Sequence, residues 1–383
     1  MRRVLLVDDD VALLDGLRKA LRTYRDWRVD VAAGGRAAIE ALERAPAYDV
    51  VISDARMPDV DGEALMRARI SRWPGALRVV RSGEVRAETA ERLLGLSHQI
   101  LAKPVRPATL HSRVEEALHS RVWLPSPGLT SLIGQLGDLP SLPRLYQELS
   151  SLLGDPRFEL GAVVALLETD PAVCAKVLKL VNSAYFGFSR RVSSVREAVR
   201  LLGASQLRAL VLTAQLFPDD EVSSRMLMEE VVARLGALRK LERLSGPWGW
   251  IELACTAATL CDIGRLVMAQ RRLESFRSCE AAVEGGGDRL EVEARFFGAD
   301  HTQLGAALLS LWGLPPELID AIAAHHARPT TRGPGAALAL VSLAQSAREG
   351  TRAAGPLGDA VAHAGALFGL DGPASLSLCG ETP

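Results

Sequence analysis

Short apolar runs alternate with amphipathic segments over the first 120 residues. Val4–Val7 and Val50–Ser53 have the length and composition of buried strands, whereas Val11–Leu21 carries leucines at helical spacing. The same alternation predicts strands at 28–32, 77–80 and 100–102 and helices at 36–45, 63–72, 88–94 and 108–118. Five strands with helices between them predict a doubly wound parallel sheet that is covered on both faces.

The pattern changes after residue 120. Pro125, Pro127 and Gly128 cannot continue a helix and predict a linker at 121–138. Beyond it, strand-like runs disappear and leucine- and alanine-rich helical segments follow one another. We therefore predict a domain at 1–120, an all-helical domain at 139–335 and a weakly helical extension with a ragged tail at 336–383. The expected fold class is α/β followed by all-α.

Composition narrows the class of protein. The chain has 383 residues, 48% of them hydrophobic and 24% charged, with a formal net charge of −1. This profile is typical of a soluble globular protein of two or three domains, with no bulk attraction to nucleic acid or to an acidic membrane surface. The apolar runs are shorter than the ~18 residues of a membrane span, and we expect no signal peptide. Five cysteines without paired spacing indicate free thiols in a reducing cytoplasm.

Polar residues follow the predicted strands directly. Asp8 and Asp9 come after the first strand, Asp54 after the third, Ser82 after the fourth and Lys103 after the fifth. The carboxyl ends of parallel strands meet at one edge of a sheet, where ligands bind in open α/β folds. We therefore expect these side chains to converge.

This residue set predicts phosphoryl chemistry. Three neighbouring carboxylates repel one another unless a hard cation such as Mg²⁺ neutralises them. Asp54 would then act as the nucleophile and form an acyl phosphate. Lys103 would pair with the new charge, and Ser82 would donate a hydrogen bond to it. The alternative, in which Asp8–Asp10 merely solvate a strand end, is weaker because it leaves the other residues unexplained.

The same residues carry a family resemblance. Val7–Asp9, the run 53–62, Ser82-Gly83 and Lys103-Pro104 resemble the response-regulator receiver family over about residues 1–120. The resemblance implies a flavodoxin-like sheet of strand order 2-1-3-4-5. It also implies a cis Lys103–Pro104 peptide bond, a Mg²⁺ cofactor and a sensor histidine kinase as phosphoryl donor.

Two residues depart from the family pattern. Ile100 stands where the family usually has an aromatic residue that helps to relay phosphorylation, and Arg81 stands where the family tends to be apolar. Both departures concern the relay of the signal, while the residues for phosphorylation itself are present.

A second resemblance begins at Leu139. Leu139–Pro143, Thr169–Ala172, Lys179–Gly187 and Val192–Gly203 look like the HDOD domain, a helical relative of the HD-type metal-dependent phosphohydrolases. The match extends to about residue 330. Within it, Asn182 and Ser183 are more often turn-forming residues than ligand contacts.

The HD relatives need histidines and a His-Asp pair to hold metal. Here Cys261 replaces the histidine of that pair, and Met226–Leu244, where a first histidine is expected, contains none. The remaining candidates are Cys261, Asp262, His301, His325 and His326. Because a cysteine thiolate can bind zinc, these residues could form a mononuclear site. A decayed site that hydrogen-bonds inside a helical core is favoured, since a hydrolytic site needs a nearly complete ligand set.

These observations favour a response regulator in which phosphorylation of Asp54 gates a non-catalytic helical output domain. Its expected partners are the histidine kinase and a downstream signalling protein, and a homodimer is left open. Two alternatives remain: a residual metal-dependent phosphohydrolase acting on cyclic dinucleotides, and a regulator that binds nucleotide or nucleic acid. The latter is disfavoured because the chain has no helix-turn-helix signature and no glycine-rich phosphate loop.

Overall fold

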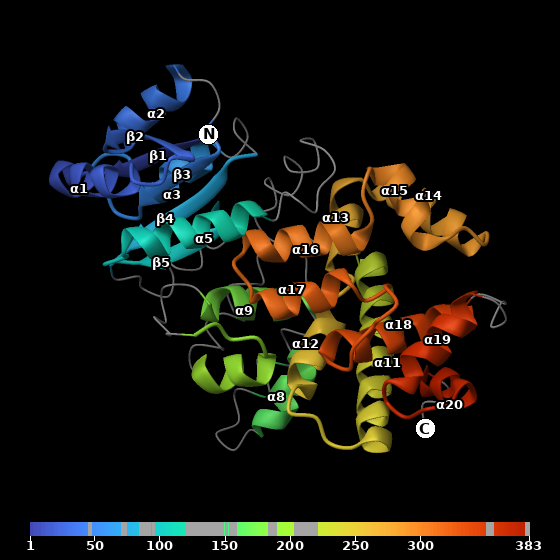
Figure 1. Ribbon diagram of the computed structural model, residues 1–383. Coiled ribbons are helices and arrows are strands. Elements are labelled where there is room, and N and C mark those ends of the chain that lie inside the picture. Colours follow the sequence, from blue (N-terminus) through green and yellow to red (C-terminus); the bar gives the residue numbers. More distant parts are fainter. Residues whose placement is uncertain are drawn as a thin grey trace. The chain divides into compact units, whose positions relative to one another are not determined.

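The computed structural model describes residues 1–44, 48–69, 75–83, 96–119, 159–182, 190–202, 221–349 and 356–379, together with positions 93, 149 and 152. The chain forms two compact units (Figure 1). The first unit contains Met1–Asp138, Lys179–Arg191 and Ala307–Gly313, and the second contains Leu139–Leu178, Val192–Ala306 and Leu314–Pro383. The domain limits drawn from the sequence stay a prediction, and each unit is described on its own.

A five-stranded parallel sheet forms the centre of the first unit. Its strands are β1 (Arg2–Asp8), β2 (Trp27–Ala33), β3 (Val50–Asp54), β4 (Leu77–Ser82) and β5 (Gln99–Ala102). They lie in the order β2-β1-β3-β4-β5, which confirms the strand order that the receiver resemblance implies.

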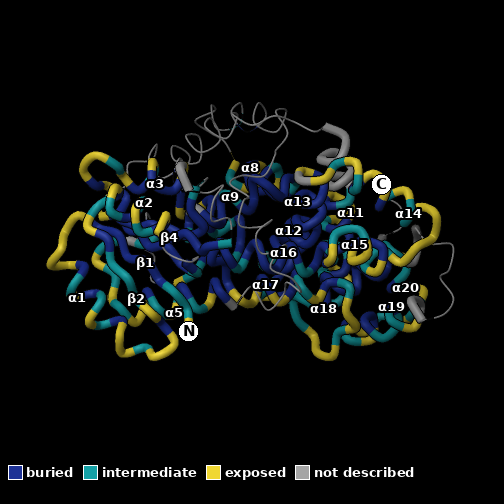
Figure 2. Tube along the Cα trace, turned by 90° about the horizontal axis from the view of Figure 1, so that it is seen from above, coloured by how far each residue is buried: buried dark blue, intermediate teal, exposed yellow. Residues whose placement is uncertain are grey.

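Helices cover both faces of this sheet, as predicted (Figure 1). They are α1 (Val11–Leu21), α2 (Gly35–Arg44), α3 (Gly62–Arg69) and α5 (Pro107–His119). Helix α1 packs against α5, and α2 packs against α3. Strands β3 and β4 are buried along their whole length and β1 is buried from Val4 onward, and this part of the unit is largely dark blue in Figure 2. Burial on both faces explains the hydrophobic runs of β1 and β3, whereas β4 also buries Arg78 and Arg81.

The predicted element bounds differ from the observed ones mainly at strand ends. The α1 bounds are as predicted, whereas β1 begins two residues early because Arg2 and Arg3 pair with Trp27 and Arg28 of β2. An apolar pattern detects only the buried middle of such a strand. The helix expected at 88–94, apart from Leu93, and the linker expected at 121–138 lie outside the described residues.

All regular secondary structure among the described residues of the second unit is helical. Its helices are α8 (Leu160–Leu167), α9 (Pro171–Val181), α11 (Glu221–Ser245), α12 (Ile251–Leu260), α13 (Ile263–Arg271), α14 (Leu273–Glu284), α15 (Arg289–Phe297), α16 (His301–Leu311), α17 (Pro316–Ala323), α18 (Pro334–Glu349), α19 (Pro356–Ala366) and α20 (Gly372–Leu376). The C-terminal residues of α9 and α16 belong to the first unit. Helix α12 lies centrally and packs against α11, α17 and α18. Its small buried residues, such as Ala254, Ala257 and Ala258, allow this close approach.

The C-terminal stretch is more regular than its sequence indicated. Helix α18 begins at Pro334 and buries Leu338, Leu340 and Val341, and α19 and α20 follow it. Glycine and serine lower local helix propensity here, whereas burial of an apolar face stabilises the helices of this extension. Among the described helices, none has both the length and the apolar character needed to cross a membrane.

Candidate functional site

Strand register brings acidic and basic side chains together at the carboxyl edge of the sheet. Val7 of β1 pairs with Ser53 of β3, and Asp54 pairs with Arg81 of β4. The next residue after Val7 is Asp8, so Asp8, Asp54 and Arg81 form a row across three adjacent strands. Residues in such a row project to the same side of a sheet.

The three predicted carboxylates lie close together. One carboxylate oxygen from each of Asp8, Asp9 and Asp54 lies within 4.8 Å of those of the other two. Asp8 is only 1% exposed, which excludes the alternative that it merely solvates the strand end, whereas Asp9 is exposed. This oxygen-rich set fits the ligand preference of Mg²⁺.

Lys103 contacts two of these carboxylates. Its Nζ lies 2.8 Å from Asp54 Oδ1 and 3.0 Å from Asp8 Oδ2. The Lys103 backbone N–H donates to the Ser82 carbonyl at 2.8 Å, and the Lys103–Pro104 bond is cis, as the resemblance implies. The lysine and the buried Ser82 therefore lie at the edge where the sequence predicted them.

Arg81 is the residue of this edge whose position the sequence did not reveal. Its side chain is 2% exposed, and Nη2 lies 2.6 Å from Asp8 Oδ2. Burial lowers the pKa of Arg81, while the nearby Asp8 and Asp54 carboxylates oppose that shift. Arg81 was noted only as a departure in the relay, but its side chain belongs to the acidic cluster. Correct strand register would have placed it beside Asp54.

Local geometry around the cluster explains several neighbouring residues. Asp10 caps α1, because its Oδ1 accepts a hydrogen bond from the Leu13 N–H at 3.0 Å, and its own N–H donates to Asp8 Oδ1. Gly62 begins α3 so close to β3 that a Cβ there would lie 2.2 Å from the Asp54 carbonyl oxygen. Glycine at 62 is therefore a packing requirement of the Asp54 loop.

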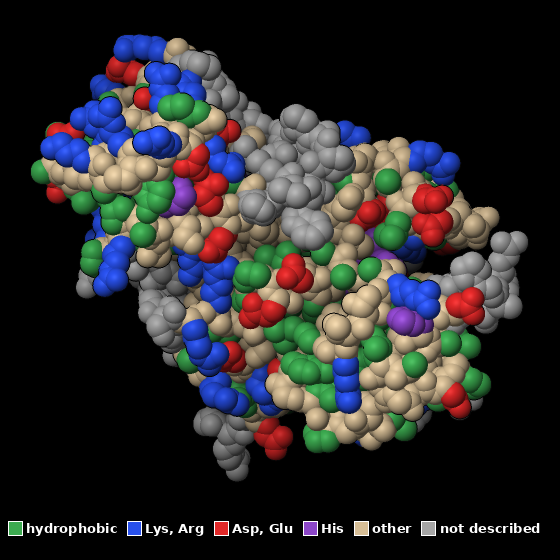
Figure 3. Space-filling view, viewed as in Figure 1, with side chains coloured by type: hydrophobic (Ala, Val, Ile, Leu, Met, Phe, Trp, Pro, Cys, Tyr) green, Lys and Arg blue, Asp and Glu red, His purple; other side chains and the backbone are tan. Residues whose placement is uncertain are grey.

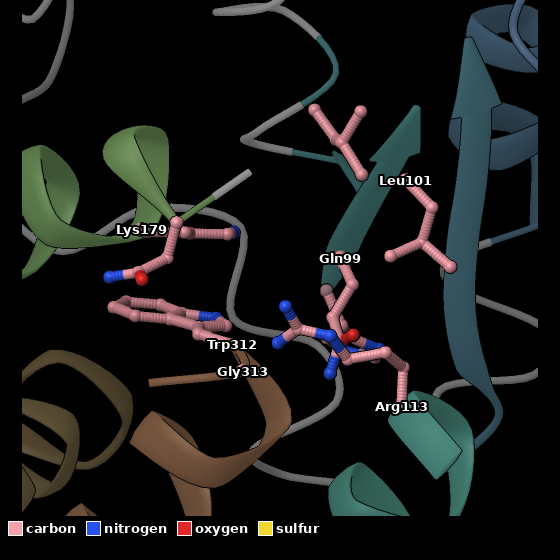
Figure 4. Close-up of a pocket in the computed structure, with 9 residues that line it drawn as sticks. Gln99, Leu101, Arg113, Lys179, Trp312 and Gly313 are labelled. Carbon is pink, nitrogen blue, oxygen red and sulfur yellow. The ribbon is translucent and has the colours of Figure 1, made fainter. Parts of the chain in front are cut away.

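The first unit also contains a small polar pocket at the start of β5 (Figure 4). Gln99 Nε2 donates to the Leu311 carbonyl at 3.3 Å, and Lys179 Nζ donates to the Ser97 carbonyl at 3.0 Å while lying 4.7 Å from the Trp312 ring centroid. The centre of a water molecule can reach about 10 Å³ of this pocket, which is room for about one water and not for a nucleotide.

Two of the residues singled out by the sequence lie at this pocket. Asn182 is half-buried and lines it, whereas Ser183 lies outside the described residues. Ile100, the residue that departs from the family's aromatic position, also lines the pocket and is buried.

The second unit brings the five HD-type candidates together. Ligand atoms of Cys261, Asp262 and His325 lie within 4.8 Å of one another, as do those of His301, His325 and His326. All but His326 are buried. The geometry alone therefore resembles that of a metal site.

An arginine occupies this cluster. Arg234 of α11 donates to Cys261 Sγ at 3.2 Å and forms an ion pair with Asp262. Its Nη2 also donates to Glu230 Oε2 at 3.1 Å. Sequence pattern does not reveal this role of Arg234, although the residue lies in Met226–Leu244, where the HD resemblance implies a histidine.

A second arginine completes the charge network. Arg265 of α13 donates to Glu230 at 2.6 Å and to Glu280 at 3.1 Å, and lies 3.9 Å from Asp262. Although burial alone raises the pKa of Asp262, Arg234 and Arg265 together hold it well below its usual range. Asp262 is therefore an ionised carboxylate whose charge is already compensated.

His301 has polar neighbours at both ring nitrogens. Its Nδ1 lies 2.6 Å from Glu293 Oε2, and its Nε2 lies 3.1 Å from His325 Nε2. His325 Nδ1 lies 2.6 Å from the Ile322 carbonyl, to which it donates. A metal ion bound to either His301 nitrogen would have to displace one of these hydrogen bonds.

Burial disfavours ionisation of the remaining candidates. It raises the pKa of Cys261 to about 12, and burial with the neighbouring His301 lowers that of His326 to about 3. Cys261 is therefore a thiol in this arrangement, not the thiolate that binds zinc.

Two family models match the chain in the regions just described. The response regulator receiver domain matches residues 4–115, and the HDOD domain matches residues 139–328. The chain is thus a response regulator with an N-terminal receiver domain and a C-terminal HDOD domain.

Individual relatives are similar to this chain over part of its length. The transcriptional regulatory protein ZraR of Escherichia coli K12 is 30% identical over 79% of this chain and 64% of its own length. An uncharacterized protein of Treponema pallidum is 26% identical over 52% of this chain and 40% of its own length. The chain thus spans less than two thirds of either relative. A virulence factor of Campylobacter jejuni (cj0248) shares the fold, with a TM-score of 0.52 and 19% identity over 63% of this chain and 91% of its own.

Proposed function

We propose that a sensor histidine kinase phosphorylates Asp54 and that this modification gates the HDOD domain, which acts in the cytoplasm by binding a downstream signalling protein. The observation that carries the proposal is the contact of Lys103 Nζ with Asp54 at 2.8 Å, beside the carboxylates of Asp8 and Asp9. A lysine in that position can pair with the charge that phosphorylation adds.

Each residue of the cluster has a chemical role in this proposal. When bound by Asp8, Asp9 and Asp54, Mg²⁺ supplies positive charge that draws in the phosphoryl donor. A carboxylate oxygen of Asp54 attacks phosphorus, the bond from phosphorus to the kinase histidine nitrogen breaks, and an acyl phosphate forms. Lys103 exchanges its ion pair with Asp54 for one with the phosphoryl group, and Ser82 donates to a phosphoryl oxygen.

Strand β5 offers a path for the signal. Lys103 follows the last residue of β5 directly, and Gln99 at its first residue contacts Leu311. A phosphoryl group adds about −1.5 to −2 charges at Asp54, so a shift of Lys103 towards it would pull on β5. This supports gating through the pocket of Gln99, Lys179 and Trp312 within the first unit.

Phosphorylation itself is tested with a small phosphodonor such as acetyl phosphate. We expect wild type to gain a slower band on a phosphate-affinity gel in the presence of Mg²⁺, and Asp54→Asn to gain none. Asp49→Asn is a matched control, since Asp49 precedes β3 outside the cluster, and it should be phosphorylated like wild type. A wild-type chain that gains no band would contradict the proposal.

Gating is tested separately by a pull-down with wild type and Asp54→Ala, each with and without the phosphodonor. The proteins that wild type recovers should change when the donor is added, and those recovered by the variant should not. Equal recovery in all four samples would show that phosphorylation does not gate binding, even where Asp54 is modified.

We propose further that the HDOD domain is not a hydrolase. The histidine cluster alone would favour a metal-dependent phosphohydrolase, but Arg234 contacts two of its candidate ligands, and both ring nitrogens of His301 already contact Glu293 and His325. Turnover of a cyclic dinucleotide that disappears in His301→Ala would reverse this conclusion.

On one face of the molecule, surface charge does not favour nucleic acid as a ligand. On the face in Figure 3, Lys and Arg side chains are interspersed with Asp and Glu side chains over the described residues. Such a face offers no continuous basic surface to a phosphate backbone.

A further inference from the structure

The guanidinium group of Arg234 binds the same atoms that a metal ion would need. Cys261 Sγ, an Asp262 oxygen and a His325 nitrogen lie within 4.8 Å of one another, and Arg234 donates to the first two. Arg234 is 5% exposed, so this contact is made away from solvent.

Arg234 stands in the part of the chain where a metal-binding relative would have a histidine. It lies on α11, in the segment Met226–Leu244 where the HD resemblance places a first histidine. A histidine at this position would be a neutral ligand, so a metal ion would have to neutralise the charge of Asp262. An arginine instead brings the positive charge itself, with donors that match a carboxylate.

The charged side chains around Asp262 leave Arg234 as its closest cation. Arg265 is committed to Glu230 and Glu280 and lies 3.9 Å from Asp262. If Arg234 is removed, Asp262 keeps the more distant Arg265 and the His301 ring nitrogen at 3.3 Å, and a buried carboxylate that loses its closest cation is strongly destabilised. A divalent cation is then the natural replacement.

We propose that Arg234 is the built-in cation of a vestigial metal centre, and that replacing it with a neutral side chain opens a transition-metal site formed by Cys261, Asp262 and His325. The wild-type chain does not bind metal at this site, because the guanidinium group of Arg234 already occupies the position of the cation. Binding in the variant releases the Cys261 thiol proton to solvent as the metal–sulfur bond forms. This inference is independent of phosphorylation at Asp54.

The test is a Co²⁺ titration of the full chain in excess Mg²⁺, comparing wild type with Arg234→Ala. We expect the variant to develop a thiolate-to-Co²⁺ absorption band at one ion per chain, with an affinity about 100-fold or more above that of wild type. Zn²⁺ should compete for the site and raise the melting temperature of the variant, while leaving that of wild type unchanged.

Three controls assign the band. Adding Cys261→Ser to Arg234→Ala should abolish it, which separates this site from thiol-free clusters such as that of Asp26, His111 and Glu115. Arg265→Ala removes an equally buried arginine that does not contact Cys261, and it should show no band. Arg234→Met keeps the aliphatic bulk without the charge, and it should behave like Arg234→Ala.

Two results would overturn the proposal. One is a wild-type chain that shows the same thiolate band with the same affinity. The other is the absence of any band in both neutral variants at position 234, whether they fold alone or are refolded in the presence of Zn²⁺. In that case Arg234 is only a structural ion-pair partner.

Discussion

Buried arginines lie in both acidic clusters of this protein. Arg81 pairs with Asp8 in the receiver domain, and Arg234 pairs with Asp262 in the HDOD domain. A guanidinium group carries a permanent charge and up to five donors, so it can satisfy a buried carboxylate that would otherwise need a metal ion. The consequences differ, because the Asp9 and Asp54 carboxylates add further oxygen atoms beside Arg81.

Arg81 should weaken Mg²⁺ binding in the receiver domain. Its positive charge lies at the edge of the cluster, so Arg81→Met should raise Mg²⁺ affinity roughly tenfold. Without Mg²⁺ the same variant should lose about 3–5 kcal/mol of unfolding free energy, because Asp8 loses a buried partner. Urea unfolding at a series of Mg²⁺ concentrations gives both quantities.

Arg78 provides the matched control for this prediction. It is equally buried on the same strand, but its side chain contacts His98 and the Leu96 carbonyl, not the acidic cluster. Arg78→Met should lower stability at every Mg²⁺ concentration by the same amount. If Arg81→Met and Arg78→Met respond to Mg²⁺ alike, the charge of Arg81 has no special effect on the cation.

At the scale of elements, a close helix contact positions the HDOD cluster. Asp262 precedes α13 and His301 begins α16, and the two helices meet at Gly264. A Cβ on Gly264 would lie 2.1 Å from the His301 carbonyl oxygen, which belongs to backbone and cannot rotate away. The absent side chain therefore lets Asp262 Oδ1 approach His301 Nε2 to 3.3 Å.

Gly264→Ala should consequently destabilise the helical unit by about 1–3 kcal/mol, since α16 must move to admit the methyl group. Gly236→Ala is the control, because Gly236 lies exposed on α11 with nothing within 4 Å of its Cβ position. That change should stabilise the helix by about 0.5–1 kcal/mol. Urea unfolding followed by circular dichroism at 222 nm (about the α-helical minimum) compares the two; equal effects would contradict the close contact.

At the scale of the whole molecule, buried charge makes stability depend on pH. Glu168, at the end of α8, is buried, and its Oε1 has no hydrogen-bond partner among the residues that the structure describes. Burial, reinforced by the charge of Glu252, raises the pKa of Glu168 to about 7, with Arg239 and Arg196 opposing the shift. Glu168 is therefore held as a neutral acid in the folded chain well above the pH at which an unfolded glutamate ionises.

This shift predicts a loss of stability as pH rises. Below about pH 4.5 Glu168 is neutral in both states; between there and about pH 7 only the unfolded state releases the proton, so folding becomes less favourable. Glu168→Gln should stabilise the chain by up to about 3 kcal/mol at pH 8 and by almost nothing at pH 4. Unfolding free energies measured between pH 4 and pH 8 test this prediction. Glu274→Gln is the control, since Glu274 is exposed, and it should leave the pH profile unchanged. A uniform effect of Glu168→Gln at all pH values would show that its carboxyl is not perturbed.

Sequence pattern was sufficient for most of the receiver domain. Buried parallel strands are apolar along their length, so β1 and β3 were visible as continuous runs, and the bounds of α1 were predicted correctly. Asp8, Asp54 and Lys103 could be found because each lies at the end of a strand or directly after it, and strand ends meet at one edge. The C-terminal helices were underestimated, since their stability comes from burial rather than from local propensity.

The sequence by itself determined the order of the elements, the parallel sheet and the carboxylates at its edge, because these follow from hydrophobic period and chain direction. Only the tertiary structure decided which cations meet those carboxylates. Arg81 is 73 residues from Asp8, and Arg234 is 28 residues from Asp262. Their pairing depends on strand register and on helix packing, and neither leaves a mark in the local pattern. A long flexible side chain such as arginine looks like a surface residue until the fold buries it beside an opposite charge.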